Sequence, residues 1–204
     1  LNLTQDVFND ALTSYHHNSV GGYHPAKLSI YEDLLTYQLR KSPMNLQVLN
    51  MLNTKYVIAP GQNNQPQLTI NPDALGACWL VQHIQFVKDQ AAGMKTLDNF
   101  NPSDTAIVED IFKSSIPFMP EADSTAGISL LKNDFETVTY SYHAAKNQFA
   151  VFREIFYDRG WKAYIDDKEA PIVKVDYALR GLALPAGNDN IRLEFKPQRA
   201  YMGE

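Results

Sequence analysis

Three histidines lie close together near the start of the chain, where they could form a binding site. His16, His17 and His24 flank a short segment that contains paired glycines and Tyr23. Imidazole nitrogens bind metal ions, and glycine lets a backbone approach a ligand closely. Adjacent histidines point in different directions, however, and no carboxylate lies within this turn at a ligating spacing. We therefore expect structural or surface histidines and no metal site, and we keep Tyr23 and His24 as candidate binding residues.

Several carboxylates lie near one another in the C-terminal part of the chain: Asp158, Asp166, Asp167, Glu169 and Asp176. A glycosidase needs two carboxylates that face each other across a sugar. Most of these residues fall in turns or at strand ends, where Asp is favoured because it bonds its own backbone. The pattern therefore favours solvated turn residues, and we predict no catalytic residue in this chain.

Aromatic residues of the same region could form a platform that stacks on a sugar ring: Tyr157, Trp161, Tyr164 and Tyr177. Trp161 lies on the apolar face of its strand, which predicts a core position. Tyr164 lies on the opposite face, so it is the candidate for ligand binding. Arg180 is a further candidate, because an arginine close to Asp176 could pair with it across neighbouring strands or hold an anion.

Other classes of chemistry find little support in the sequence. It contains no Walker A motif, no G-x-S-x-G, no G-x-G-x-x-G and no H-E-x-x-H. Cys78 is the only cysteine, which excludes an internal disulfide and a cysteine-based zinc site. The net charge is −5 and no dense Lys/Arg cluster occurs, which argues against a nucleic-acid partner. We predict no cofactor, and no apolar run is long enough to cross a bilayer.

Residues 149–195 must position most of these candidates, and their pattern is typical of antiparallel strands joined by turns. Apolar and polar residues alternate over 161–166 and again over 191–196, as in strands with one buried face. Residues 149–157 are largely apolar on both faces, which predicts a central strand. Regularly spaced strands of this kind indicate a sandwich or a barrel-like fold.

The preceding residues predict helices first and strands later. Helices are expected over 4–15, 26–40, 44–52 and 89–97, and strands over 55–59, 68–70, 77–87, 105–108, 128–131 and 135–143. This order predicts an α+β fold, in which N-terminal helices are followed by an antiparallel β-sandwich-like domain with one inserted short helix. We expect residues 1–60 to pack as a helical segment on a sandwich of residues 61–204, giving one compact unit.

Three segments together carry a family resemblance: SYHHNSVGGYHPAK at 14–27, LNMLNTKYVI at 49–58, and GWKAYID at 160–166 followed by Arg180-Gly181 and Pro185-Ala186-Gly187. In this order, and over nearly the whole chain, they resemble the soluble C-terminal part of the YfhO family of large multi-spanning bacterial membrane proteins. The chain departs from the family at one hairpin, where Asp166-Asp167 replaces the usual Asp-Gly. That departure bears on the type of turn.

The resemblance implies a location and a set of partners. Such a domain is expected on the extracytoplasmic side of the bacterial cytoplasmic membrane, attached to transmembrane helices of its own parent chain. The family is similar to glycosyltransferases that use lipid-linked sugars, with a catalytic acid near the first membrane helices and outside this chain. A non-catalytic domain that helps to form the acceptor side, or that stabilises the membrane part, is therefore expected. A lipid-linked sugar or envelope glycan is a further expected partner. The alternatives are a carbohydrate-binding module and a purely structural or oligomerisation domain.

Overall fold

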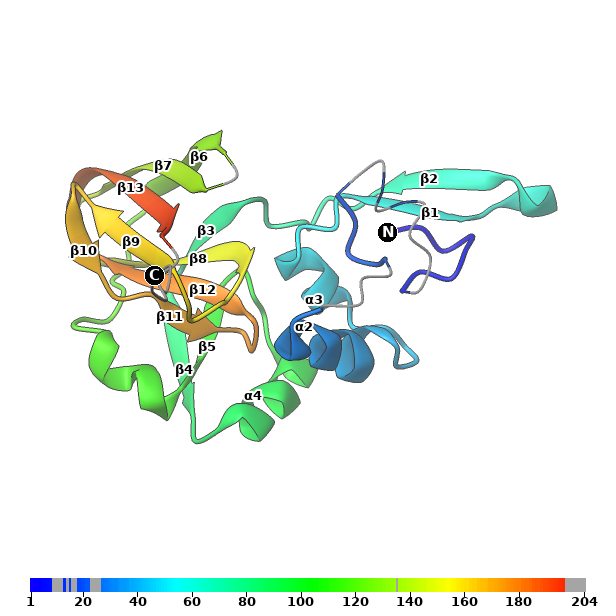
Figure 1. Ribbon diagram of the computed structural model, residues 1–204, viewed down its shortest axis with the longest axis horizontal. Helices are drawn as coiled ribbons and strands as arrows, with labels where there is room; N and C mark the ends of the chain where they lie inside the picture. Colours follow the sequence, from blue (N-terminus) through cyan, green and yellow to red (C-terminus); the bar gives the residue numbers. More distant parts are fainter. Residues whose placement is uncertain (9–12, 14, 16–17, 23–26, 135, 197–204) are drawn as a thin grey trace, which may run out of the picture. The chain divides into compact units, whose positions relative to one another are not determined.

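The computed structural model describes the chain except for residues 9–12, 14, 16–17, 23–26, 135 and 197–204 (Figure 1). Its contacts divide the chain into two units, Leu1–Gly76 and Ala77–Glu204. The predicted packing of residues 1–60 on a sandwich of residues 61–204 stays a prediction.

Two of the predicted N-terminal helices are present in the first unit. Helix α2 spans Ser29–Leu34 and continues as a π-helical turn over Leu35–Leu39, while α3 spans Leu46–Met51. The Asn45 side chain caps α3 by accepting the backbone N–H groups of Gln47 and Val48. Leu34, Leu35, Leu39, Val48 and Met51 are almost completely buried, so these helices supply the core of the first unit.

The helix predicted from Thr4 does not begin there, because residues 4–8 contain turns and no helix. The Asn2 side chain accepts both the backbone N–H and the hydroxyl of Thr4, at 3.1 and 2.7 Å. Such a local side-chain bond offers the backbone an alternative to helix. Thr13 and Tyr15 are helical, and most of the remaining predicted span lies outside the described residues.

A two-stranded hairpin follows the helices of the first unit. Strand β1 (Tyr56–Pro60) pairs antiparallel with β2 (Pro66–Ile70) across a short 3-10 turn at Gln62–Asn64. The strands predicted over 55–59 and 68–70 are therefore confirmed, and they pair with each other. A parallel bridge joins Asn2 to Ile58, so the N-terminal segment lies along the other edge of β1.

Two sheets form the second unit. The five-stranded sheet has the order β10-β9-β13-β7-β6. Its strands are β6 (Gly127–Asn133), β7 (Thr137–Ala144), β9 (Trp161–Ile165), β10 (Lys168–Ala170) and β13 (Gly187–Phe195). The six-stranded sheet has the order β3-β8-β12-β11-β5-β4. Its strands are β3 (Cys78–Val81), β4 (His83–Val87), β5 (Thr105–Glu109), β8 (Gln148–Ile155), β11 (Val173–Val175) and β12 (Leu179–Leu184).

The core of the second unit combines inward-facing side chains of both sheets. It includes Val138, Tyr140, Tyr142, Ala150, Phe152, Ala163, Leu182, Leu184, Ile191 and Leu193. Val138, Tyr140 and Tyr142 lie on the buried face of β7. The predicted central position of β8 is confirmed, because it pairs with both β3 and β12. Helix α4 (Gln90–Thr96) is the predicted inserted helix and is capped by Asp89. Short 3-10 turns follow at Leu97–Asn99 and Asp110–Ser115. The predicted α+β fold class is thus confirmed.

The single strand predicted over residues 77–87 is divided at Gln82. Strand β3 pairs antiparallel with β8 at one end of the six-stranded sheet, and β4 pairs parallel with β5 at the other end. The N–H groups of Gln82 and His83 both donate to the Asp104 carbonyl, at 2.9 and 3.0 Å. Because one residue separates β3 from β4, the sheet must curl until its two ends meet at Gln82 (Figure 1).

The hairpin that joins β9 to β10 has an aspartate at both central positions. Asp166 and Asp167 have φ of 44° and 64°. Positive φ at both central residues defines a type I′ turn, which suits the right-handed twist of a two-residue hairpin. Replacing the usual Asp-Gly by Asp166-Asp167 therefore does not prevent a type I′ turn, although glycine is the commoner residue at the second position of such a turn.

Candidate functional site

Arg180 is a buried cation between the two sheets. Strand β12 places it on the same face as Leu182 and Leu184, and only 4% of its surface is exposed. Its Nε and Nη2 donate to the Ile155 carbonyl at 3.2 and 3.0 Å. The guanidinium carbon lies 4.0 Å from the centroid of the Trp161 ring. Nη1 is buried and has no hydrogen-bond partner among the described residues.

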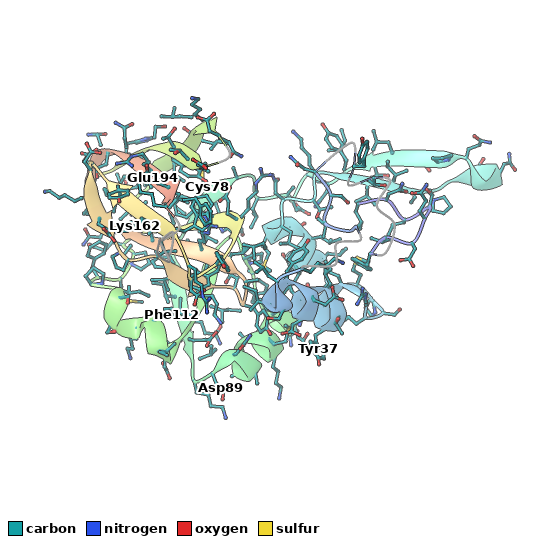
Figure 2. The ribbon with its side chains drawn as sticks, viewed as in Figure 1. Tyr37, Cys78, Asp89, Phe112, Lys162 and Glu194 are labelled. Carbon is teal, nitrogen blue, oxygen red and sulfur yellow. The ribbon has the colours of Figure 1, made fainter. Side chains whose placement is uncertain are left out.

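Polar side chains from three further strands gather near this cation. Glu154 on β8 accepts a hydrogen bond from the Tyr140 hydroxyl on β7 at 3.2 Å. Cys78 on β3 is packed against the same core and lies among the crowded side chains of the second unit (Figure 2). We call Cys78, Tyr140, Glu154, Trp161 and Arg180 the Arg180 cluster. It forms a polar end to an otherwise apolar sandwich interior.

Burial sets the protonation states in the Arg180 cluster. It lowers the pKa of Arg180 to about 10, so the guanidinium stays charged at neutral pH. Burial, reinforced by the Glu154 charge, raises the pKa of the Cys78 thiol to about 12. The same two causes raise the pKa of Tyr140. Both groups are therefore neutral at physiological pH, and Cys78 lacks the thiolate character of a nucleophile. The cluster can hold the two sheets together, and the Glu154 carboxylate can offset the charge of the Arg180 guanidinium.

Asp176 lies elsewhere, in the connection between β11 and β12, and is completely buried. Its Oδ1 accepts the backbone N–H of Ile107 at 2.8 Å, and its own N–H donates to the Ile107 carbonyl at 2.8 Å. The predicted pairing with Arg180 is therefore wrong, because Asp176 bonds to β5 instead. Its Oδ2 has no hydrogen-bond partner among the described residues.

Desolvation raises the pKa of Asp176 to about 7, and the bond from Ile107 opposes this shift. A solvated turn position was predicted for this residue and is also wrong. The other four candidate carboxylates, Asp158, Asp166, Asp167 and Glu169, are exposed as predicted. No other described residue combines complete burial with a carboxylate, so Asp176 is the one described carboxylic acid that the fold encloses completely.

Tyr164 lies in an ion network on the outer face of the five-stranded sheet. It is the cross-strand neighbour of Arg192, whose guanidinium carbon lies 4.3 Å from the ring centroid. Arg192 also donates to Asp167 at 3.0 Å and to Glu194. One face of the Tyr164 ring is therefore occupied by a cation. Lys162 is the cross-strand neighbour of Glu194, and both residues are labelled in Figure 2.

Trp161, which was predicted to be core, is partly buried and packs against the core and against Phe195, at 5.3 Å between ring centroids. Its stacked contact with Arg180 has no counterpart in the sequence prediction. Trp161 and Tyr164 thus each carry an arginine on one face of the ring.

The predicted residues Tyr23 and His24, together with His16 and His17, lie outside the described residues. Gly21 and Gly22, which precede Tyr23, are described, and both pack closely against the backbone of Val7. Gly22 N–H donates to the Val7 carbonyl at 3.1 Å, and a Cβ on Gly21 would lie 1.7 Å from that carbonyl oxygen. The described part of the chain contains no group of three His, Cys, Asp or Glu side chains that could hold a metal ion.

One exposed pair was not found from the sequence. His83 Nδ1 lies 3.0 Å from Asp104 Oδ2, and the Thr105 hydroxyl donates to the same oxygen at 3.0 Å. These bonds lower the pKa of Asp104. The two residues are 21 positions apart and meet only because β4 and β5 run parallel, so no local pattern could reveal the pair. Glu154 was visible as a polar interruption in an apolar strand, but its partners were not.

Comparisons with known proteins found a family that matches the C-terminal strands of the second unit. The model of the family described as "Bacterial membrane protein YfhO" matches residues 122–204, which contain β6 to β13. The "Uncharacterized protein YfhO" of Bacillus subtilis (strain 168) is 37% identical over 60 residues, which are 29% of this chain and 7% of that protein. The chain therefore matches only a small part of this relative's length. No solved structure matches the chain. The predicted resemblance to the YfhO family is confirmed for residues 122–204, and its extension to residues 14–27 and 49–58 stays a prediction.

The described helices are short. None of them has the length and apolar character that a bilayer-spanning helix requires.

Proposed function

From its similarity to the YfhO family, we propose that this chain is an extracytoplasmic, non-catalytic domain of a large multi-spanning membrane protein. The parent resembles glycosyltransferases that use lipid-linked sugars, and the domain helps to form the acceptor side or stabilises the membrane part. The observation that carries the proposal is the match of residues 122–204, most of the sandwich, to a family described as bacterial membrane proteins. Its partners are then the membrane helices of the parent chain and a lipid-linked sugar or envelope glycan.

The chemistry of the described groups supports an accessory role. The thiol and phenol of the Arg180 cluster are neutral at physiological pH, and the one carboxyl group whose pKa is raised to about 7, Asp176, is sealed inside the fold. A catalytic acid or base must reach within hydrogen-bond distance of its substrate. The Arg180 cluster and Asp176 are placed to hold strands of the second unit together, which is a structural role.

The alternative of a carbohydrate-binding module has less support. Sugar binding by stacking needs an open aromatic face. Arg192 lies over the ring of Tyr164 and Arg180 over the ring of Trp161. A sugar that stacked on those faces would have to displace a guanidinium that is itself hydrogen-bonded.

The location can be tested by cysteine labelling of the full-length parent in intact cells. Ser124 is exposed in a loop, so Ser124→Cys should react with a membrane-impermeant maleimide. Ala150→Cys is the matched control, because Ala150 is completely buried and should not react before denaturation. Labelling of Ser124→Cys only after cell lysis would overturn the proposed location.

The acceptor-side role can be tested at the turn that begins with Gly21. Deleting Gly22 and Tyr23 in the parent removes the bond to the Val7 carbonyl and should lower glycosylation of the envelope polymer. The isolated chain that carries this deletion should keep the unfolding transition of its second unit. The Ser124→Cys variant serves as the control for a harmless surface change. Unchanged glycosylation by the deletion variant would leave only the structural role.

A further inference from the structure

The β1–β2 hairpin carries a strongly exposed apolar face. Its register pairs Tyr56 with Ile70 and Ile58 with Leu68. Since alternate side chains of a strand share a face, these four residues lie together, and we call them the hairpin face. The exposed fractions are 50% for Tyr56, 60% for Leu68 and 61% for Ile70. Exposed apolar groups that are contiguous mark sites of contact with a partner or a membrane.

The hairpin also carries no charged side chain along its exposed edge, where proline is present at Pro66. Residues 56–70 contain no Asp, Glu, Lys or Arg. Soluble proteins generally place charges, most often lysine, on such edges. One edge is occupied, because Leu3 N–H donates to Ile58 O at 2.7 Å and Ile58 N–H donates to Leu1 O at 2.8 Å. On its other side, β2 pairs with no strand of the described chain.

A cation lies at the base of the uncharged segment. The Lys55 ammonium is 5.9 Å from the centroid of the Tyr56 ring, and both side chains are exposed. Tyrosine rings with an apolar body and a polar tip are enriched where membrane meets water. A lysine beside them can extend its apolar stem along the surface and keep its charge at the level of the headgroups.

We propose that the hairpin face rests on the surface of a phospholipid bilayer, at the boundary between headgroups and acyl chains. The inference rests on the proposed function, which puts the domain beside a membrane. The absence of charge over residues 56–70 fits this occupant, because an interfacial apolar face excludes charges while it tolerates the amides of the hairpin tip.

A second copy of the chain explains less of what is observed. Pairing of two β2 edges would occupy the free edge but would leave the hairpin face of both copies in water. A bilayer surface covers the apolar face of a hairpin that lies flat on it. The edge of β2 then stays in the hydrated headgroup region, where water satisfies its backbone groups.

The test is flotation of the 204-residue protein with vesicles of phosphatidylcholine, with and without phosphatidylglycerol. The unchanged protein should float with both. The double variant Leu68→Asp, Ile70→Asp should bind at least about tenfold more weakly, because two apolar contacts are replaced by charges. The matched control is Gln67→Asp, Thr69→Asp, which adds the same charge to the opposite face of the same strand. It should stay within about twofold of the unchanged protein on phosphatidylcholine.

The inference would be overturned if the unchanged protein did not float, or if the two double variants lost binding equally. It would also be overturned if the protein bound no vesicles but self-associated in light scattering, and only Leu68→Asp, Ile70→Asp abolished that self-association. Failure here is separable from failure of the proposed function. Labelling of Ser124→Cys in intact cells would still show an extracytoplasmic domain, even if its hairpin binds no lipid.

Discussion

At the scale of single residues, Asp176 has the most direct consequence for stability. Its pKa is raised to about 7 in the folded protein, above the ordinary value of 3.8. The folded state therefore holds the proton more tightly than the unfolded state. Stability is greatest below the unfolded pKa and falls as the pH rises from about 4 to about 7. The total loss is on the order of 4 kcal/mol for a shift of this size.

We expect Asp176→Asn to remove most of that fall and to exceed the unchanged protein in stability at pH 8. Asparagine keeps an oxygen that can accept from Ile107 N–H, carries no charge, and tolerates the positive φ of 48° at this position. Denaturant unfolding at pH 5 and pH 8 measures the effect. Asp158→Asn, in an exposed turn, is the control and should change neither value. A pH dependence that survives in Asp176→Asn would contradict the assignment.

The same residue shows where sequence reasoning ends at this scale. Turn chemistry placed the exposed carboxylates Asp158, Asp166 and Asp167 correctly, because a turn is a local structure. Burial of Asp176 depends on β5, whose Ile107 is 69 positions away. The contact of Arg180 with the Ile155 carbonyl spans 25 positions, so no local pattern could have identified it.

At the scale of elements, no separate bounds were predicted for β12, in which Arg180 and Gly181 interrupt the apolar pattern. The structure gives Gly181 a packing reason. A Cβ at this position would lie 2.6 Å from Val175 Cγ1 and 2.8 Å from the Phe149 ring. The strands around it were predictable, since their period-2 alternation is intrinsic to a half-buried strand. The break between β3 and β4 at Gln82 was not predictable, because β3 pairs with β8 and β4 pairs with β5, and these partners lie elsewhere in the sequence.

Gly181→Ala should therefore destabilise the second unit by about 1–3 kcal/mol, because the new methyl overpacks a buried site. The unfolding midpoint in urea measures this cost. In the background of Phe149→Leu, which removes the ring that crowds this position, the same change should cost clearly less. Equal costs in the two backgrounds would show that Phe149 is not the obstacle.

At the scale of the whole molecule, each unit has its own buried core. Leu34, Leu35 and Met51 are buried in the first unit, and the sandwich core lies wholly within the second. We expect a fragment of residues 77–204 to fold alone, with a single cooperative transition in calorimetry. A fragment of residues 83–204 is the control. It lacks β3, which exposes the edge of β8, and it should aggregate or fail to fold. An unfolded 77–204 fragment would show that the units depend on each other.

The meeting of β3 and β4 at Gln82 also constrains the order of events while the chain is being synthesised. Strand β4 finds its partner β5 soon after both emerge, but β3 must wait for β8, which begins at Gln148. Strand β8 in turn needs β12, which ends at Leu184. Pairings of such long sequence separation form slowly. The ring of strands therefore closes only after β12 has been synthesised, and the apolar residues of β3 stay without their partner strand until then.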